Sequence, residues 1–364
     1  MAANGLRHRK GLPMNSVEVL RTLSEAFGPS GFEDEVRNEI RQMVEPLVDD
    51  VRVDALGNLI ATKRGSGNRT LMLDAHMDEI GFMVTWIEDG GFLRFTTIGG
   101  WDPRIVPAHA VTIRTDRGTY IRGMIGTAPP HILRPEDREK PFRIDDLFID
   151  IGVSSPEEAA ALGIRIGSPA VISYGFEQLG DDVVMGKAFD DRAGCAVVVG
   201  ALEALRNETT EITVVAAFTV QEEVGLRGAQ TAAFQIDPDI AIALEGSIAA
   251  DMPGVPPARQ PTRQGQGPSI RIMDSGMIGM PRVIRALAET AETESIRFQY
   301  QVPAPGGTDA GVIHRSKAGV LAGVVSLPCR YIHSPYATLR LSDFEEAVRL
   351  ITAFSRRLPG IAGI

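Results

Sequence analysis

Apolar residues recur along this chain in two patterns, helical spacing and continuous β-branched runs, and the two patterns alternate. Helical spacing predicts helices at 17–27, 32–47, 193–205, 281–293 and about 342–356. Runs rich in β-branched residues predict buried strands at 59–62, 70–75, 212–220, 239–244 and 320–326. The last helix starts with a capping-box spacing, in which Ser342 would cap and Glu345 would reach back. This alternation predicts an α/β fold with a sheet sandwiched by helices.

From about Gly81 to Val171 the alternation is interrupted. Short β-rich segments at 81–87, 93–98, 110–115 and 119–125 are separated by Gly and Pro turns, and helical spacing returns only at 156–162. A run of short strands of this kind is typical of a small barrel. We therefore expect a larger α/β domain in two parts, residues 1–80 and 176–364, with a small β-barrel-like domain inserted at residues 81–175.

Composition narrows the classes of protein that this chain can belong to. With 364 residues, 44% hydrophobic and 23% charged, the chain can bury a large core. A formal charge of −10 disfavours nucleic acid as a partner, and no uncharged apolar stretch approaches a membrane span. The start, residues 1–10, is basic, but polar residues and Pro13 follow where a signal peptide would be apolar. Cys195 and Cys329 lie in apolar surroundings that suit buried free thiols, so we expect a cytoplasmic protein.

Two adjacent glutamates, Glu222 and Glu223, follow the predicted strand at 212–220. Side chains alternate along a strand, so neighbouring carboxylates point in different directions and can have different roles. Binding grooves of open α/β sheets lie at the carboxyl ends of strands. Taken alone, such a pair is more often a solvated acidic turn.

Other residues that bind metals stand at the ends of other predicted elements. They are His76 and Asp78 after one strand, Asp190 and Asp191 before a helix, Glu245 after a second strand and His333 after a third. Two imidazoles with several carboxylates suit Zn²⁺, Co²⁺ or Mn²⁺. Each has an ordinary alternative: a satisfied core histidine for His76, a helix N-cap for Asp190 or Asp191, and a loop carboxylate for Glu245. Their joint placement favours a metal site.

Five stretches of the chain, in order and covering nearly its whole length, resemble the M42 metallo-aminopeptidases, which include tetrahedral, deblocking and glutamyl aminopeptidases. The stretches are Asp74-Ala75-His76-Met77-Asp78-Glu79-Ile80-Gly81, Gly186-Lys187-Ala188-Phe189-Asp190-Asp191-Arg192-Ala193-Gly194, Gln221-Glu222-Glu223-Val224-Gly225, Gly306-Gly307-Thr308-Asp309-Ala310 and Arg330-Tyr331-Ile332-His333-Ser334-Pro335. The resemblance implies a mixed-sheet catalytic domain and a peptide substrate with a free N-terminus. It also implies a homo-oligomer, for which the family's dodecamers are the model, and gives the inserted domain a role in substrate access or oligomerisation.

The resemblance also implies two divalent metal ions per subunit, with zinc as the first expectation and cobalt or manganese as alternatives. Asp190 would bridge the metals, His76 and Glu245 would complete one site, and Glu223 and His333 would complete the other. Glu222 would be the general base, and Asp78 would hold His76. Many family members carry aspartate at the position of Glu245, so this chain departs from the pattern there.

Other functions share parts of this pattern. A carboxypeptidase or an amidohydrolase would use the same two-metal chemistry, some relatives carry endoglucanase labels, and the chain could be an inactive assembly protein. The preferred N-terminal residue does not follow from the motifs. Arg259 and Arg263, in a Pro- and Gln-containing loop, could meet an acidic side chain, although loop arginines are usually solvated.

Overall fold

The computed structural model describes residues 15–129, 131–135, 140 and 142–361. Most of these residues belong to a part of the chain that is built around an eight-stranded sheet. The order of its strands is β1-β2-β12-β3-β13-β16-β14-β15. The strands are β1 (Asp50–Val53), β2 (Leu59–Lys63), β3 (Thr70–His76), β12 (Thr213–Thr219), β13 (Ile240–Ile248), β14 (Ser269–Arg271), β15 (Gln299–Gln301) and β16 (Leu321–Cys329). Strands β12, β3, β13 and β16 are parallel to one another, whereas β2 and β14 pair with their neighbours β12 and β16 in antiparallel fashion. The predicted α/β fold, with a mixed sheet, is confirmed.

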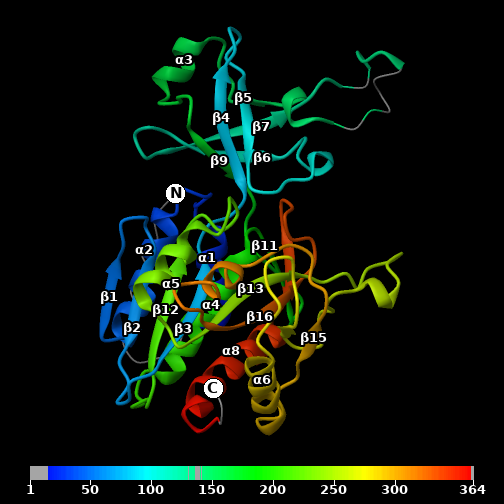
Figure 1. Ribbon diagram of the computed structural model, residues 1–364. Helices are drawn as coiled ribbons and strands as arrows, with labels where there is room; N and C mark the ends of the chain where they lie inside the picture. Colours follow the sequence, from blue (N-terminus) through cyan, green and yellow to red (C-terminus); the bar gives the residue numbers. More distant parts are fainter. Residues whose placement is uncertain (1–14, 130, 136–139, 141, 362–364) are drawn as a thin grey trace.

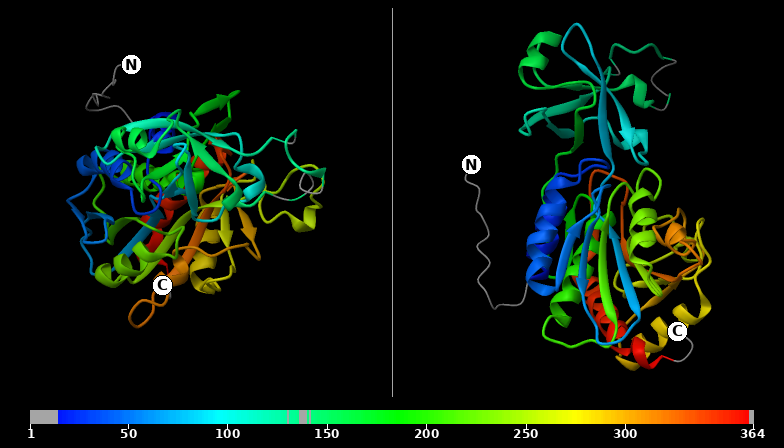
Figure 2. Two further views of the ribbon diagram at one scale, coloured as in Figure 1. Left: turned by 90° about the horizontal axis from the view of Figure 1, so that it is seen from above. Right: turned by 60° about the vertical axis from the view of Figure 1, so that its left-hand side comes forward.

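Helices cover both faces of this sheet, as the right-hand view of Figure 2 shows. One face packs against α1 (Ser16–Glu25), α2 (Asp34–Val44), α4 (Phe189–Leu205), α6 (Pro281–Thr293) and α8 (Leu341–Arg357). The other face packs against α5 (Arg227–Ile236) and α7 (Ala310–Ile313). Strand β3 shows why both faces are apolar: Leu71 and Leu73 belong to the first core and Met72 to the second. The described residues also form the short 3-10 helices η1 (Glu45–Leu47), η2 (Pro103–Ile105), η4 (Ile144–Asp146), η5 (Pro257–Arg259) and η6 (Leu358–Gly360).

The inserted segment forms a closed antiparallel barrel, as expected, with its own apolar core. Its strands, in sheet order, are β4 (Gly81–Ile87), β5 (Leu93–Ile98), β8 (Phe148–Asp150), β7 (Tyr120–Gly126), β6 (Ala110–Arg114) and β9 (Pro169–Ile172), and α3 (Pro156–Ala161) lies between β8 and β9 in the chain. Strands β10 (Glu177–Leu179), β11 (Val183–Gly186) and β17 (Ala337–Arg340) form a smaller antiparallel sheet. Figure 1 shows the barrel above the end of the large sheet where β3 leads into β4.

The start of α8 differs from the capping box predicted for it. The helix begins at Leu341, so Ser342 lies inside its first turn rather than before it. The carboxylate of Asp182 accepts hydrogen bonds from the Ser342 backbone N–H at 2.8 Å and from its hydroxyl at 3.0 Å. A carboxylate that is distant in sequence therefore supplies the acceptor that the local pattern attributed to Ser342.

Three further observations bear on the class of protein. Cys195 and Cys329 are buried and unpaired, as expected. Within the part of the chain that the structure describes, none of the helices combines the length and the apolar character that crossing a bilayer requires. The basic start at residues 1–10 lies outside the described residues.

Candidate metal centre

The parallel strands bring the predicted site residues to one edge of the large sheet. His76 is the last residue of β3 and pairs in register with Thr219, the last residue of β12. Glu222 and Glu223 follow β12 directly, because the chain turns at Gln221, which has a positive φ of 58°. Strand β13 extends to Ile248, so Glu245 lies within the strand, opposite Ser326 of β16, rather than after it. Parallel strands end on the same side of a sheet, which is why residues so distant in sequence meet.

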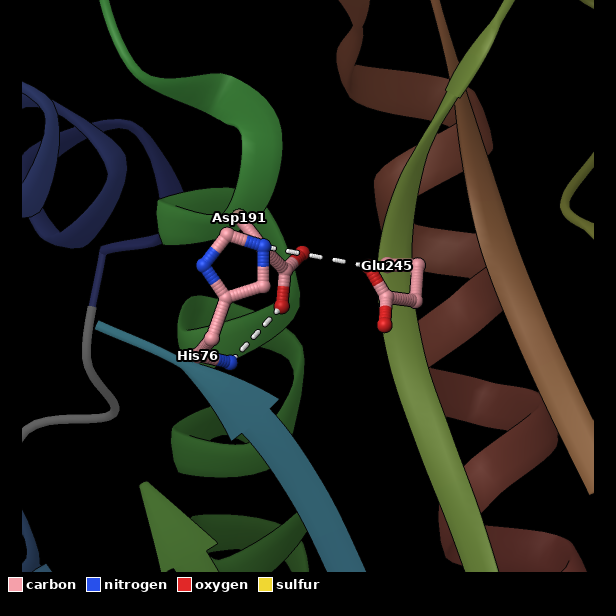
Figure 3. A group of neighbouring side chains, drawn as sticks. All are labelled: His76, Asp191 and Glu245. Atoms are coloured by element: carbon pink, nitrogen blue, oxygen red, sulfur yellow. Dashed lines mark hydrogen bonds and ion pairs between the residues drawn. The ribbon is translucent and has the colours of Figure 1, made fainter. Parts of the chain in front are cut away.

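His76 lies at the centre of a first group of carboxylates. Its Nε2 atom is 3.6 Å from Asp190 Oδ1, 3.8 Å from Glu222 Oε2 and 3.8 Å from Glu245 Oε2. The side chains of His76 and Glu245 are almost completely buried. The backbone N–H of Asp309 donates to Glu245 Oε1 at 3.3 Å and so restrains this longer side chain. Figure 3 shows His76 and Glu245 pointing toward each other from neighbouring strands.

His333 forms a second group with two other carboxylates. Its Nε2 atom is 3.2 Å from Glu223 Oε1 and 3.4 Å from Asp190 Oδ2. The two oxygens of Asp190 therefore face different histidines, Oδ1 toward His76 and Oδ2 toward His333. The Nδ1 atom of His333 lies 2.9 Å from the carbonyl oxygen of Gly100, which follows strand β5 of the barrel. Sequence reasoning missed Gly100, since a backbone carbonyl leaves no signal in a motif.

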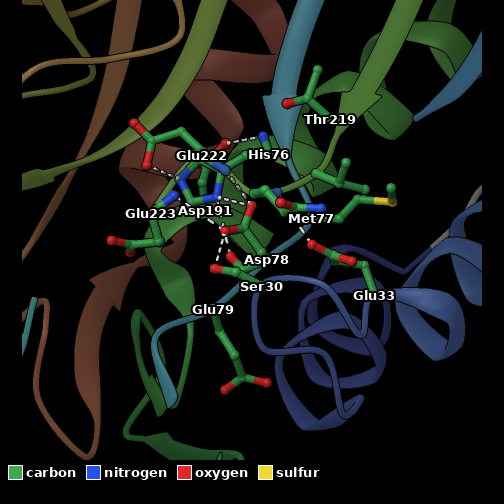
Figure 4. A network of polar contacts seen from close by, with 12 residues as sticks. Ser30, Glu33, His76, Met77, Asp78, Glu79, Asp191, Thr219, Glu222 and Glu223 are labelled. Atoms are coloured by element: carbon green, nitrogen blue, oxygen red, sulfur yellow. Dashed lines mark hydrogen bonds and ion pairs between the residues drawn. The ribbon is translucent and has the colours of Figure 1, made fainter. Parts of the chain in front are cut away.

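Asp78 connects His76 to the glutamate pair. It is fully buried, and Oδ1 accepts from the backbone N–H of Glu222 at 2.9 Å while Oδ2 accepts from that of Glu223 at 3.1 Å. The His76 Nδ1 atom lies 3.1 Å from the Asp78 carbonyl oxygen and 3.5 Å from Oδ1. Ser30, which the sequence did not single out, donates to Oδ2 at 2.6 Å. Figure 4 shows this network, in which Asp78 fixes the backbone of both glutamates.

Asp191 lies next to the first group but is bound differently from Asp190. Its Oδ1 accepts from the Gly194 backbone N–H at 3.0 Å, and its Oδ2 accepts from that of His76 at 3.3 Å. The first of these is the hydrogen bond of a helix N-cap, and regular helical geometry in α4 begins only after Asp191. The N-cap alternative therefore describes Asp191, whereas the oxygens of Asp190 face the histidines.

Burial and mutual repulsion dominate the electrostatics of these groups. Burial raises the pKa of Glu222 and of Glu245 well above the usual value, and neighbouring carboxylates add to this effect. Burial opposes the charge on His333, but hydrogen bonds with Asp190 and Glu223 outweigh it and raise its pKa to about 11. Concentrated buried negative charge of this kind requires compensation by protons or by cations.

The donor atoms fit divalent cations of the zinc type. Imidazole nitrogens and carboxylate oxygens lie within 4.8 Å of one another in the sets His76, Asp191 and Glu245; His76, Glu222 and Glu223; and Asp190, Glu223 and His333. Zn²⁺, Co²⁺ and Mn²⁺ all accept such mixed nitrogen and oxygen ligands. Among the described residues, His109, His131 and His314 take no part in such sets.

A cavity of about 550 Å³ adjoins both groups and opens beside them. It is lined by ligand-type residues from both groups and also by apolar side chains and Arg271. A small substrate in this cavity would lie next to every predicted site residue except Asp78, which is buried behind the others.

Comparison with known proteins relates this geometry to a family. The family model described as M42 glutamyl aminopeptidase matches residues 57–350. The chain is 34% identical to the lysyl aminopeptidase of Pyrococcus furiosus over 352 residues, 94% of this chain and 97% of that protein. It is 32% identical to the glutamyl aminopeptidase of Lactococcus lactis over 349 residues, 93% of this chain and 96% of that protein.

Solved structures give the same picture. The TET aminopeptidase of a marine sediment Thaumarchaeota archaeon superposes with a TM-score of 0.92 at 41% identity, covering 94% of this chain and 96% of that chain. The Pyrococcus horikoshii TET1 peptidase, which can assemble into a tetrahedron or a large octahedral shell, has a TM-score of 0.84 at 36% identity over 94% of this chain and 99% of that chain. A structure of PhTET1-12s holds a dodecamer in the asymmetric unit.

Proposed function

The chain belongs to the M42 glutamyl aminopeptidase family and is therefore an aminopeptidase, a hydrolase acting on peptide bonds; from that premise, we propose that it uses two divalent cations, zinc in the first instance, held at the edge of the large sheet. The family resemblance read from the motifs is confirmed by this match. One observation carries the two-cation proposal: the carboxylate of Asp190 lies between His76 and His333, with one oxygen facing each. Cobalt and manganese are the alternatives, since they accept the same donors.

The proposed ligand sets follow the two groups. Asp190 is shared, His76 and Glu245 complete one set, and Glu223 and His333 complete the other. Asp191 stays outside both sets because its oxygens accept backbone N–H groups. When bound, the cations would act as Lewis acids on the scissile carbonyl and lower the pKa of the attacking water.

Glu222 is the proposed general base. It borders the cavity, and apart from its contact with His76 its carboxylate has no hydrogen-bond partner among the described residues. It takes a proton from the attacking water and passes it to the nitrogen of the leaving amine. Asp78 does not touch the substrate; it positions the backbone of Glu222 and Glu223 and the ring of His76.

Recognition of the free N-terminus is the remaining requirement of an aminopeptidase. The buried oxygens of Asp78 are already engaged, so the carboxylates that border the cavity, Glu245 among them, favour a positively charged α-amino group. The enzyme should therefore hydrolyse a free aminoacyl anilide and not its N-acetyl form. Equal rates on the two substrates would contradict this proposal.

A metal panel tests the proposed function directly. The purified protein is stripped with a chelator and assayed on aminoacyl anilides before and after addition of Zn²⁺, Co²⁺ or Mn²⁺, with metal content measured in parallel. We expect the stripped protein to be inactive and activity to return as occupancy approaches two ions per chain. Full activity at one ion per chain would contradict the two-cation proposal.

Self-association is proposed from the assemblies of the homologues. The proposed domain boundaries remain at residues 80/81 and 175/176, with the barrel serving substrate access or contacts between subunits. The barrel carries exposed large apolar residues that suit such contacts, including Trp86, Met124 and Ile166. Size-exclusion chromatography with light scattering should give the mass of a homo-oligomer, for which a dodecamer is the expected form; a monomer would contradict the proposal.

A further inference from the structure

The cavity beside the proposed metal centre is lined by two chemically different kinds of residue. Besides the carboxylates and histidines, its lining includes the apolar Leu226, Ile248 and Ile332 together with Ser247 and Arg271. Among the described residues that line it, Arg271 is the only lysine or arginine. A single guanidinium therefore lines a cavity that is otherwise rich in carboxylates.

The sheet register places Arg271 close to the proposed ligands. Arg271 ends β14, which pairs with β16, and Ser326 of β16 lies opposite Glu245 of β13. The Nη2 atom of Arg271 donates to Ser326 Oγ at 3.2 Å. Since adjacent strands lie about 4.8 Å apart, the guanidinium reaches the strand immediately beside Glu245.

The guanidinium is fixed in place without using all its donors. Asp274 Oδ2 lies 3.2 Å from Nη1, and Asp274 Oδ1 is held by the backbone N–H groups of Gly276 and Met277. Arg271 is only 4% exposed, and Nη1 and Nη2 each carry a second N–H group besides the one that donates to Asp274 or Ser326. A buried arginine with unused donors can still donate to a further acceptor, and charge-assisted bonds of this kind are the strong ones.

Ser247 supplies a second donor in the lining of the cavity. It lies two residues after Glu245 in β13, so both side chains point to the same face of the sheet. Its hydroxyl accepts a hydrogen bond from Gln301 Nε2 at 2.6 Å. The Ser247 proton thus remains available for an acceptor other than Gln301.

We propose that this cavity receives the side chain of the substrate's N-terminal residue, and that Arg271, assisted by Ser247, selects an acidic side chain over neutral and basic ones. The inference rests on the proposed function of the same site. Relatives named for lysyl and for glutamyl substrates both match this chain over nearly its full length, so family membership does not decide the preference. Arg259 and Arg263, considered from the sequence, are exposed and do not line the cavity.

The test compares kcat/KM for the para-nitroanilides of Glu, Gln, Leu and Lys in the zinc-loaded protein. Wild type should favour Glu over Gln and disfavour Lys most. Arg271→Met should lower kcat/KM for the Glu substrate by about 10- to 100-fold, the range for losing a hydrogen bond to a charged group, while the Leu substrate changes by less than about threefold. For the Glu substrate, Arg271→Lys should have a kcat/KM between those of wild type and Arg271→Met, because lysine keeps the charge and lacks the planar guanidinium.

Arg340→Met is the matched control, because Arg340 also pairs with a carboxylate, Asp182 at 2.8 Å, but lies outside the cavity. It should leave the ratio of Glu to Leu activity unchanged. If the ratio of Glu to Leu activity is the same in Arg271→Met as in wild type, the proposal is overturned. If thermal unfolding shows that Arg271→Met does not fold, the wild-type protein still tests the proposal. A kcat/KM for the Glu substrate no higher than that for the Gln substrate would overturn the proposal. Failure of the proposed function looks different, since no aminoacyl anilide would then be hydrolysed in a chelator-sensitive way.

Discussion

Glu222 and Glu223 are neighbours in sequence but face different partners. Glu222 Oε2 lies 3.8 Å from His76, and Glu223 Oε1 lies 3.2 Å from His333. Their backbone N–H groups both donate to Asp78, which holds the two residues in one orientation. Because the side chains then diverge, substitution of one should leave the environment of the other largely intact.

This difference leads to a first prediction on metal content and turnover. Glu222→Gln should keep close to two bound metal ions per chain and lose at least about 100-fold in kcat, the range for a general base. Glu223→Ala should instead bind fewer metal ions per chain, and His333→Ala should show the same loss of metal. Metal analysis after dialysis and steady-state kinetics measure both effects. A Glu222→Gln protein that loses metal while Glu223→Ala retains it would reverse the assignment.

Glu33 gives a prediction on stability and pH. Burial, with a contribution from Asp78, raises the pKa of Glu33 from 4.5 to about 7. The folded protein thus binds this proton more tightly than the unfolded chain does, so the stabilising effect of the proton is complete below about pH 4.5 and is lost as pH rises through 7. Glu33→Gln keeps an oxygen to accept the bonds from Gly31 and Gln221. Relative to wild type, it should gain up to about 3 kcal/mol in free energy of unfolding between pH 4.5 and 8.

The difference between the two proteins, measured by chemical denaturation across this pH range, isolates Glu33 from the other carboxylates. Glu35→Gln is the control, because Glu35 lies two residues away and also accepts a backbone hydrogen bond, from the Phe27 N–H at 3.0 Å. A constant difference between wild type and Glu33→Gln across the range would contradict the raised pKa.

The site shows which residues sequence reasoning can find. Histidines and carboxylates at strand ends were predicted because their chemistry and their position in the α/β pattern both point to metal binding. Ser30, Gly100 and Arg271 were not, because their roles depend on contacts between distant segments. The chemistry of Asp190 and Asp191 alone did not distinguish them; the family resemblance pointed to Asp190 as the ligand, and the bonds from Gly194 and His76 place Asp191 at the helix start.

At the scale of elements, long periodic segments were predicted well and their ends less so. Helix α6 has the predicted bounds, whereas β13 runs four residues beyond the predicted end at Leu244, because pairing with β16 continues to Cys329. Helices α5 and α7 were missed; α5 is rich in small and polar residues, and α7 is a single short turn. The start of α8 was misassigned because its acceptor, Asp182, comes from elsewhere in the chain.

Asp182 therefore provides a prediction about an element. Asp182→Ala removes the acceptor for the Ser342 N–H and hydroxyl groups and the partner of Arg340. We expect a loss of about 1–2 kcal/mol in free energy of unfolding, the range for removing a helix cap, with kcat unchanged. Asp181→Ala, at the exposed neighbouring position, is the matched control and should cost less than about 0.5 kcal/mol. Equal losses in the two variants would show that Asp182 does not cap α8.

At the scale of the whole molecule, the barrel contributes directly to the site on the large sheet. The Gly100 carbonyl, just after β5, lies 2.9 Å from His333 Nδ1 and orients the ring toward Asp190 and Glu223. Carbonyl partners of ligating histidines commonly tune metal affinity by fixing ring orientation and tautomer. The barrel and the sheet are thus joined at a proposed ligand, so a change in the barrel should be felt at the metal centre.

Gly100→Ala tests this coupling. A Cβ atom at Gly100 would lie 3.2 Å from His333 Nδ1, closer than side chains normally approach, so the ring must shift. We expect metal affinity to fall by up to about tenfold, with loss at one of the two sites, because His333 belongs to only one proposed ligand set. Gly90→Ala is the control, since a Cβ atom there meets only Phe92, at an ordinary 3.4 Å. Titration of the stripped proteins with Zn²⁺ measures the affinities, and thermal unfolding shows whether the barrel is intact. Unchanged zinc affinity in a folded Gly100→Ala protein would mean that the barrel covers the site without helping to build it.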